Sequence, residues 1–199
     1  MKDSCPKHTR LLVAQQAARM MADEGFTSYA HAKRKAARQL GLPDDRCLPS
    51  NTEVDEAIRA HHEIFHGETH ELQLQQLRRE AISIMRLLEQ FDPHLSGAVL
   101  DGTAGRYAQT EIHLFADSLK DVELFLLNQQ IPYRMEEKPY RFGNEKHQLP
   151  AFMLESKSGP VQLIVFARDD LRMLPKKSRN SGKLERASLS ALMAMTQTT

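Results

Sequence analysis

The first half of the chain carries apolar residues at helical spacing. They predict a first helix over about residues 7–24, followed by Gly25 where a left-handed C-terminal residue belongs. A second helix is predicted over about residues 29–40, with Thr27 or Ser28 as its N-terminal cap. The N-terminal segment is therefore expected to be entirely helical.

Two further helices are predicted before residue 92. Ser50 and Glu53 have the spacing of a capping box, in which each residue satisfies a backbone N–H of the other, so a third helix is expected to end at about residue 66, before Gly67. The fourth helix is predicted over about residues 69–91, with an apolar stripe formed by Leu74, Leu77, Ala81, Ile84 and Leu88.

After Pro93 the pattern changes to short strand-like runs. Residues 97–100 and 110–115 predict two strands separated by a glycine-containing loop, and Ser118 predicts the cap of a helix. Further strands are expected at 131–135, 140–142, 151–155 and 161–166, and a short amphipathic helix at 188–195. The prediction is an α+β fold: a helical segment (1–68), a domain with a mixed or antiparallel sheet and flanking helices (69–170), and a basic C-terminal tail with a short helix (171–199).

Composition narrows the class of protein. The chain of 199 residues has a net charge of only +1, so any electrostatic partner site must be local. Cys5 and Cys47 form no Cys-x-x-Cys pair, which disfavours a disulfide framework and favours a cytoplasmic location. No apolar run approaches the roughly 20 residues that a membrane helix needs, so no membrane partner is expected.

Positive charge is concentrated in two places. The C-terminal tail is basic, and the second predicted helix has a basic outer face made of Lys33, Arg34, Lys35 and Arg38. Both regions are candidates for contacts with nucleic-acid phosphates, although a solvated helix face is an equally simple reading of the second.

A family resemblance rests on the segment from Arg79 to Phe166. A Gly102-Thr103 turn is followed about ten residues later by Glu111-Ile112-His113 on a predicted strand. This order of elements resembles the polymerase-beta-like nucleotidyltransferase superfamily, and the preceding helices are similar to those of a bacterial branch that joins a helical segment to such a sheet.

The resemblance implies a site for a nucleoside triphosphate or RNA. It implies phosphate binding by Gly102, Thr103, Arg106 and Tyr107, with basic residues of the tail (Lys176, Lys177 and Arg179). It implies catalytic roles for Asp101, Glu111 and His113, and a Mg²⁺ or Mn²⁺ ion held by Glu111 and Glu155.

The chain departs from the family pattern at two of three carboxylates. His113 replaces the second acid of the family's strand motif, and Gln162 occupies the expected position of the third. Asp101, Asp117 or Glu155 could supply the missing charge. The resemblance thus leaves open a nucleotidyltransferase with an altered metal site, or a pseudoenzyme.

Two other classes of function are kept as alternatives. One is a non-catalytic module that binds RNA or a protein. The other is a zinc-dependent hydrolase on His62-Glu63-x-x-His66, where two histidines one helical turn apart could bind zinc and Glu80 could be a distant ligand. His70 lies too early in the sequence for the third ligand of the longer metzincin motif.

Overall fold

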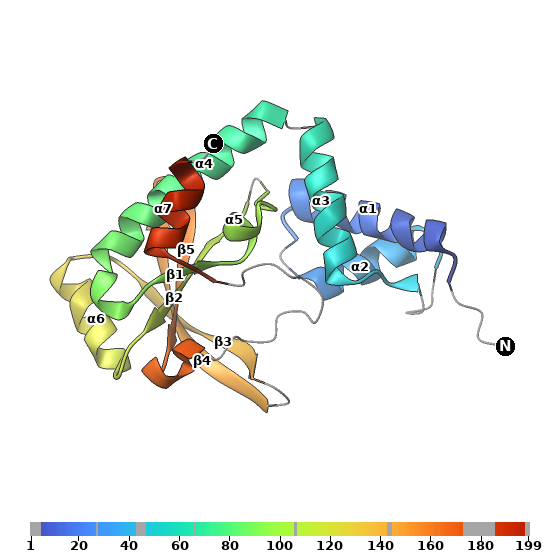
Figure 1. The fold of residues 1–199 in the computed structure, drawn as a ribbon. Helices are drawn as coiled ribbons and strands as arrows, with labels where there is room; N and C mark the ends of the chain where they lie inside the picture. The colour runs from blue at the N-terminus through green and yellow to red at the C-terminus, as the bar shows by residue number, and fades with distance from the viewer. Residues whose placement is uncertain are drawn as a thin grey trace. The chain divides into compact units, whose positions relative to one another are not determined.

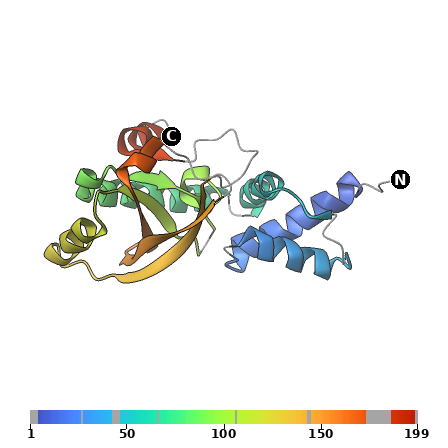
Figure 2. The ribbon, with the colours of Figure 1, turned by 90° about the horizontal axis from the view of Figure 1, so that it is seen from below.

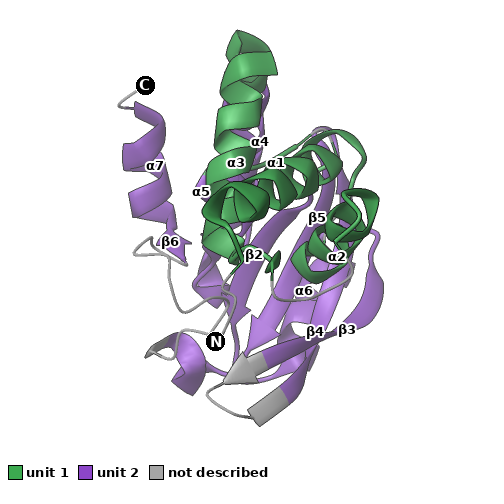
Figure 3. Ribbon diagram, turned by 90° about the vertical axis from the view of Figure 1, so that its right-hand side faces the viewer, with its two compact units in different colours: residues 1–72, 102–108 green, residues 73–101, 109–199 purple. Residues whose placement is uncertain are grey.

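The computed structural model describes residues 5–26, 28–42, 47–65, 67–105, 107–142, 145–172 and 186–197. The chain divides into two compact units (Figure 3): unit 1 comprises residues 1–72 and 102–108, and unit 2 comprises residues 73–101 and 109–199. Helices come first and the sheet follows, which confirms the predicted α+β class. The boundary between the units falls inside the fourth helix at residue 72, four residues beyond the predicted boundary at 68. The loop 102–108 belongs to the same unit as the N-terminal helices.

Unit 1 is built around three helices (Figures 1 and 2): α1 (Lys7–Asp23), α2 (Tyr29–Gln39) and α3 (Asn51–Phe65). Helix α1 contacts both of the others. Their shared core is rich in small side chains, which let helix backbones approach closely: Ala14, Ala17, Ala18, Ala32, Ala36 and Ala37, with Val13, Met20, Val54 and Ile58. The helical periodicity of the sequence predicted these elements to within a few residues.

Side-chain caps start α2 and α3. Ser28 Oγ accepts a hydrogen bond from the His31 amide, which confirms one of the two predicted caps of α2; Thr27 lies outside the described residues. At α3 the predicted capping box is formed: Ser50 Oγ accepts from the Glu53 amide (3.1 Å) and Glu53 Oε2 accepts from the Ser50 amide (2.7 Å). The Ser50 amide lowers the pKa of the Glu53 carboxyl.

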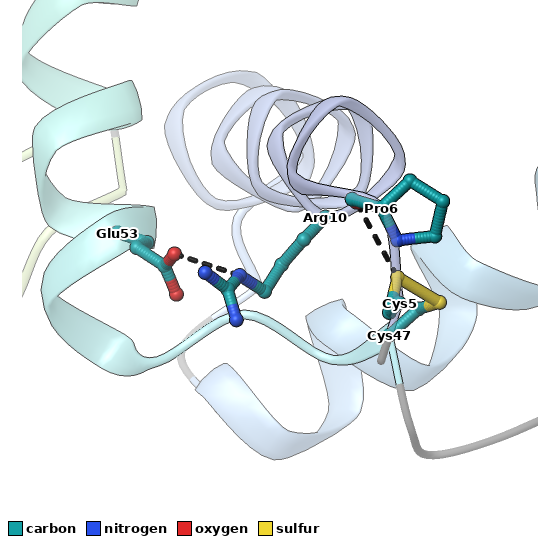
Figure 4. Close-up of a disulfide and its surroundings, with 5 residues drawn as sticks. All are labelled: Cys5, Pro6, Arg10, Cys47 and Glu53. Atoms are coloured by element: carbon teal, nitrogen blue, oxygen red, sulfur yellow. Dashed lines mark hydrogen bonds and ion pairs between the residues drawn. A yellow bond between two sulfur atoms is a disulfide. The ribbon is translucent and has the colours of Figure 1, made fainter. Parts of the chain in front are cut away.

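A disulfide joins Cys5 to Cys47, with the two Cα atoms 5.3 Å apart (Figure 4). The expectation of no disulfide was therefore wrong. The cysteines are 42 residues apart, but Cys5 lies just before α1 and Cys47 just before α3. These two helix starts are close in space, since Arg10 Nε lies 2.9 Å from Glu53 Oε1. A test for Cys-x-x-Cys spacing does not detect such a pair.

Unit 2 holds a six-stranded mixed sheet in the order β3-β4-β5-β2-β1-β6 (Figure 1). Strand β5 pairs in parallel with β2, and all other neighbours are antiparallel. The strands are β1 (His94–Ser96), β2 (Thr110–Phe115), β3 (Arg134–Phe142), β4 (Glu145–Ser156), β5 (Gly159–Phe166) and β6 (Ala187–Ser188). The helices are α4 (Gly67–Leu87), which begins in unit 1, α5 (Ala98–Asp101), α6 (Leu119–Asn128) and α7 (Leu189–Gln197), with 3-10 turns η2 (Glu89–Phe91) and η3 (Arg168–Arg172).

The first strand is the main error of the sequence prediction in this unit. Residues 97–100 were expected to be a strand, but Gly97 has φ +74° and ends β1, and residues from 98 onward form α5. The Gly97 carbonyl accepts from the Asp101 amide (3.0 Å), which closes this short helical turn. The two strands expected at 131–135 and 140–142 are replaced by the single strand β3, and β6 was not predicted. Strand β2, Ser118 as the cap of α6, and the last helix are confirmed.

The two faces of the sheet differ in chemistry because side chains alternate along each strand. One face carries apolar residues with no exposed surface: Leu95, Ile112, Leu114 and Leu163. The opposite face carries polar residues of the same strands, Ser96, Glu111, His113 and Gln162, beside a second cluster of buried side chains that includes Phe115, Ile164 and Phe166. Among the described residues no helix has the length and apolar character needed to cross a membrane.

Candidate functional site

A row of side chains crosses the polar face of the sheet. Glu111 of β2 is paired with Ser96 of β1 and with Gln162 of β5, and Gln162 is in turn paired with Met153 of β4. Ser96 and Gln162 are both 3% exposed. Gln162 Nε2 donates to Met153 Sδ at 3.2 Å. The register thus places Gln162 beside Glu111, where the family resemblance expected a carboxylate.

Glu111 Oε1 receives two protein donors. The Tyr140 hydroxyl donates to it at 3.0 Å, and His113 Nε2 lies at the same distance. The end of β1 also approaches this carboxylate, because a Cβ added at Gly97 would lie 3.6 Å from Glu111 Cβ and 3.9 Å from its Oε2. Glu111 is the least buried member of this group, with 17% of its side chain exposed.

His113 is 1% exposed and uses both ring nitrogens. Arg186 Nε donates to Nδ1 at 2.9 Å. Because a guanidinium can only donate, Nδ1 must be the acceptor. The ring proton of neutral His113 therefore resides on Nε2, which donates to Glu111 Oε1. The result is a directed chain from Arg186 through His113 to Glu111.

Arg186 enters this network from the residue before β6. Its guanidinium carbon lies 5.0 Å from the ring centroid of Phe115 and 4.7 Å from that of Phe166. Its NH1 lies 3.5 Å from the Asp170 carbonyl oxygen. With 6% exposure, Arg186 is a buried cation held on three sides.

Tyr140 is 8% exposed, and burial, reinforced by the Glu111 carboxylate, raises the pKa of its hydroxyl far above the ordinary value. Ionisation would place a second negative charge against Glu111 in a site with little water. The phenol therefore remains a hydrogen-bond donor throughout the physiological range.

Two other predicted acids, Asp101 and Glu155, belong to α5 and β4. Asp101 ends α5, a turn that Arg78 fixes by donating to the carbonyls of Val99 (3.2 Å) and Leu100 (3.1 Å). Glu155 lies on β4, its side chain is 76% exposed, and its partner is Arg134 at 3.9 Å. Within the described ranges, no three or more His, Cys, Asp or Glu side chains gather in a way that could hold a metal ion.

The predicted phosphate loop belongs to unit 1. A Cβ added at Gly105 would lie 2.7 Å from the Ala22 carbonyl oxygen, so the loop backbone lies directly on the end of α1. The ring of His70 contacts the Ala104 carbonyl oxygen (Nε2 at 2.9 Å), and the Tyr107 ring lies against Gly25. Thr103 is 6% exposed, whereas Tyr107 is largely exposed. Thr103 and Tyr107 thus belong to a different unit from Glu111 and His113.

Several predicted residues lie outside the described part of the chain: Arg106, Lys176, Lys177 and Arg179, together with His66 of the zinc motif. The rest of that motif is described. His62 is 4% exposed and stacks on His70, with ring centroids 3.8 Å apart. Glu80 Oε1 accepts from the Lys157 amide at 3.0 Å. A catalytic zinc needs an open position for water, which a stacked and buried histidine does not favour.

The basic face of α2 is smaller than its sequence indicates. Lys33 turns inward and donates to the Pro49 carbonyl and Asn51 Oδ1, and burial lowers its pKa. Lys35 Nζ lies 3.6 Å from Glu24 Oε2. Arg34 and Arg38 remain exposed on successive turns of the helix.

Sequence reasoning missed three members of the site: Gly97, Tyr140 and Arg186. The sequence could have indicated a turn at Gly97, because a glycine directly after a short strand favours one. Tyr140 and Arg186 are 29 and 73 residues from their partners in the network, and their sequence surroundings carry no corresponding signal. Comparison with known protein families and with curated proteins gives no match for this chain.

Proposed function

We propose that this chain is a nucleotidyltransferase-like protein that binds RNA or nucleotide phosphates and does not carry out two-metal nucleotidyl transfer. The observation that carries the proposal is the parallel register of Glu111 with Gln162. It reproduces the neighbouring positions at which the family resemblance places two metal-binding carboxylates, but only one of them is an acid. Metal-assisted phosphoryl transfer needs a cluster of negative oxygens around its ions, so loss of two of three acids removes most of that clamp.

RNA is favoured over a protein as the partner because exposed positive charge remains on unit 1. Arg34 and Arg38 are exposed on one face of α2 and no acidic residue lies in that helix. Guanidinium groups pair well with phosphate oxygens through two parallel hydrogen bonds. The proposal also keeps Lys176, Lys177 and Arg179, which lie outside the described residues, as phosphate-binding residues.

The test is a parallel assay of transfer and binding. The purified protein is incubated with labelled nucleoside triphosphates, with bulk RNA as acceptor, in Mg²⁺ and separately in Mn²⁺. The expected result is no label transfer, together with RNA binding that weakens as salt rises. Label transfer that the Glu111→Gln variant abolishes would instead show that the chain is an active transferase.

A cytoplasmic location is kept as part of the proposal, and the Cys5–Cys47 pair provides its test. Disulfides persist mainly in oxidising compartments. A cytoplasmic protein should therefore show both thiols free to alkylation when cells are lysed directly into an alkylating agent. Complete protection of both thiols would place the protein in an oxidising compartment.

A further inference from the structure

The donor set around Glu111 does not fit the Mg²⁺ or Mn²⁺ ion that the family resemblance implies. Such ions take oxygen ligands in octahedral geometry, and the family pattern supplies three carboxylates for them. Here the row beside Glu111 contributes a hydroxyl from Ser96 and a neutral amide from Gln162. Both nitrogens of His113 are used by Arg186 and Glu111. One carboxylate is left where a metal clamp needs several.

A fixed cation already serves this carboxylate through His113. The Arg186 guanidinium is buried, lies near the rings of both Phe115 and Phe166, and is bonded to His113 Nδ1 at 2.9 Å. Its positive charge orients the imidazole so that Nε2–H faces Glu111 Oε1. Because arginine stays protonated at every accessible pH, this charge is permanent.

We propose that Arg186 takes the electrostatic place of a divalent cation in this site, so that the Glu111 face of the sheet is complete without metal. This inference rests on the proposed function in one respect. If the chain binds phosphate-bearing ligands, that binding should not require a divalent metal ion. Arg186 acts here as a positioning residue, since it reaches Glu111 only through His113.

The first experiment measures Mn²⁺ binding by electron paramagnetic resonance of the full chain. Five proteins are compared: wild type, Glu111→Gln, Arg186→Met, Glu111→Gln/Arg186→Met, and Arg168→Met as a control that removes an exposed arginine paired with Asp117. Methionine keeps an apolar stem beside the two phenyl rings and removes the charge and the donor. The double variant reports any Mn²⁺ bound elsewhere, for example by the exposed histidines.

The expected result is no Glu111-dependent Mn²⁺ binding in wild type or Arg168→Met. Arg186→Met should bind Mn²⁺ at least about tenfold more tightly than the double variant, because without a donor at Nδ1 the ring proton can move there, and Nε2 is then free to bind a metal ion beside Glu111 Oε1. Glu111-dependent binding in wild type would overturn the proposal, and so would a folded Arg186→Met that gains nothing. If Arg186→Met does not fold, wild type compared with Glu111→Gln decides the question.

The second experiment separates this inference from the proposed function. RNA binding by wild type is measured in Mg²⁺ and in EDTA at matched ionic strength, with equal affinity in both buffers expected. Binding that requires Mg²⁺ would overturn the role of Arg186. Absence of RNA binding in both buffers would overturn the proposed function, and the Mn²⁺ titration would still decide the role of Arg186.

Discussion

Glu111 owes its environment to three side chains of unit 2. Tyr140 of β3 and His113, which lies on β2 with Glu111, bond to it directly, and Arg186 acts on it through His113. Two donors on one oxygen stabilise the charge of this partly buried carboxylate. The network is therefore a stability element as well as a candidate site, and its members can be tested by unfolding.

Tyr140→Phe removes one of these donors and keeps the ring. We expect the free energy of unfolding to fall by about 1–3 kcal/mol, because a hydrogen bond to a charged, buried acceptor is lost. Urea unfolding followed by circular dichroism measures the change. The matched control is Tyr133→Phe, whose hydroxyl donates to Glu123 at 2.9 Å in a solvated setting and should matter less. Equal losses in the two variants would contradict the prediction.

Tyr140 also predicts a loss of stability at alkaline pH. Its folded pKa is raised above the ordinary value, so the stability it contributes is complete below the unfolded pKa of about 10 and is lost as pH rises through the folded pKa. Unfolding free energies measured from pH 8 to 11 should therefore decline at the upper end in wild type. Tyr140→Phe should show a smaller decline over the same range, and parallel curves would refute the assignment.

Some residues of the candidate site could be assigned to it from the sequence. Glu111, His113 and Gln162 were identified from the family resemblance, and alternation along a strand put Glu111 and His113 on one face. The pairing of Glu111 with Gln162 came from the structure. Arg186 was not predictable, because its contact with His113 depends on how the segment before β6 returns to the sheet. No local pattern encodes a buried side chain whose partner lies 73 residues away.

At the scale of elements, the α3 capping box is a local device with a measurable effect. Ser50→Ala should cost about 1 kcal/mol of unfolding free energy, since the Glu53 amide loses its acceptor.

Glu53 of the same capping box predicts a loss of stability at acid pH. Its folded pKa is lowered, so the stability that its carboxylate contributes is present above the unfolded pKa of about 4.3 and is lost as pH falls through the folded pKa. Glu53→Gln keeps the reciprocal hydrogen bond and should flatten this acid limb, which chemical unfolding between pH 3 and 7 can detect.

The Cys5–Cys47 disulfide should stabilise the three-helix unit by restricting its unfolded state. Because the cysteines are 42 residues apart in the sequence, reduction is expected to cost about 2–4 kcal/mol. Hydrogen exchange with and without dithiothreitol should show the loss of protection in α1 and α3. The Cys5→Ser/Cys47→Ser variant is the control, because its exchange should not respond to the reductant.

The helices were predicted well because each carries its own start signal and an apolar stripe. The strands were predicted less well. Strand β3 was divided in two because Glu136, Glu137 and Lys138 interrupt its apolar pattern, and β1 was displaced because its three residues are too few to show a period. Pairing partners stabilise such strands, and pairing is a tertiary property that a single segment does not reveal.

At the scale of the whole molecule, the residues that the family resemblance assigned to one site are divided between the two units. The loop with Thr103 and Tyr107 is packed on α1 in unit 1, while the Glu111 network belongs to unit 2. The polynucleotide contact proposed above therefore has a component on unit 1 that can be altered without touching Glu111. That separation makes the electrostatic contribution of α2 testable by itself.

Arg34→Gln/Arg38→Gln should weaken binding of single-stranded RNA and make it less dependent on salt. Each phosphate contact contributes about −0.7 to the slope of log affinity against log salt, so loss of two contacts should reduce the slope by about 1.4. Fluorescence anisotropy over a salt series measures both quantities. Arg134→Gln/Arg168→Gln removes the same charge from two exposed ion pairs of unit 2 and serves as the control. If both double variants change the slope equally, net charge governs binding and α2 has no special part in it.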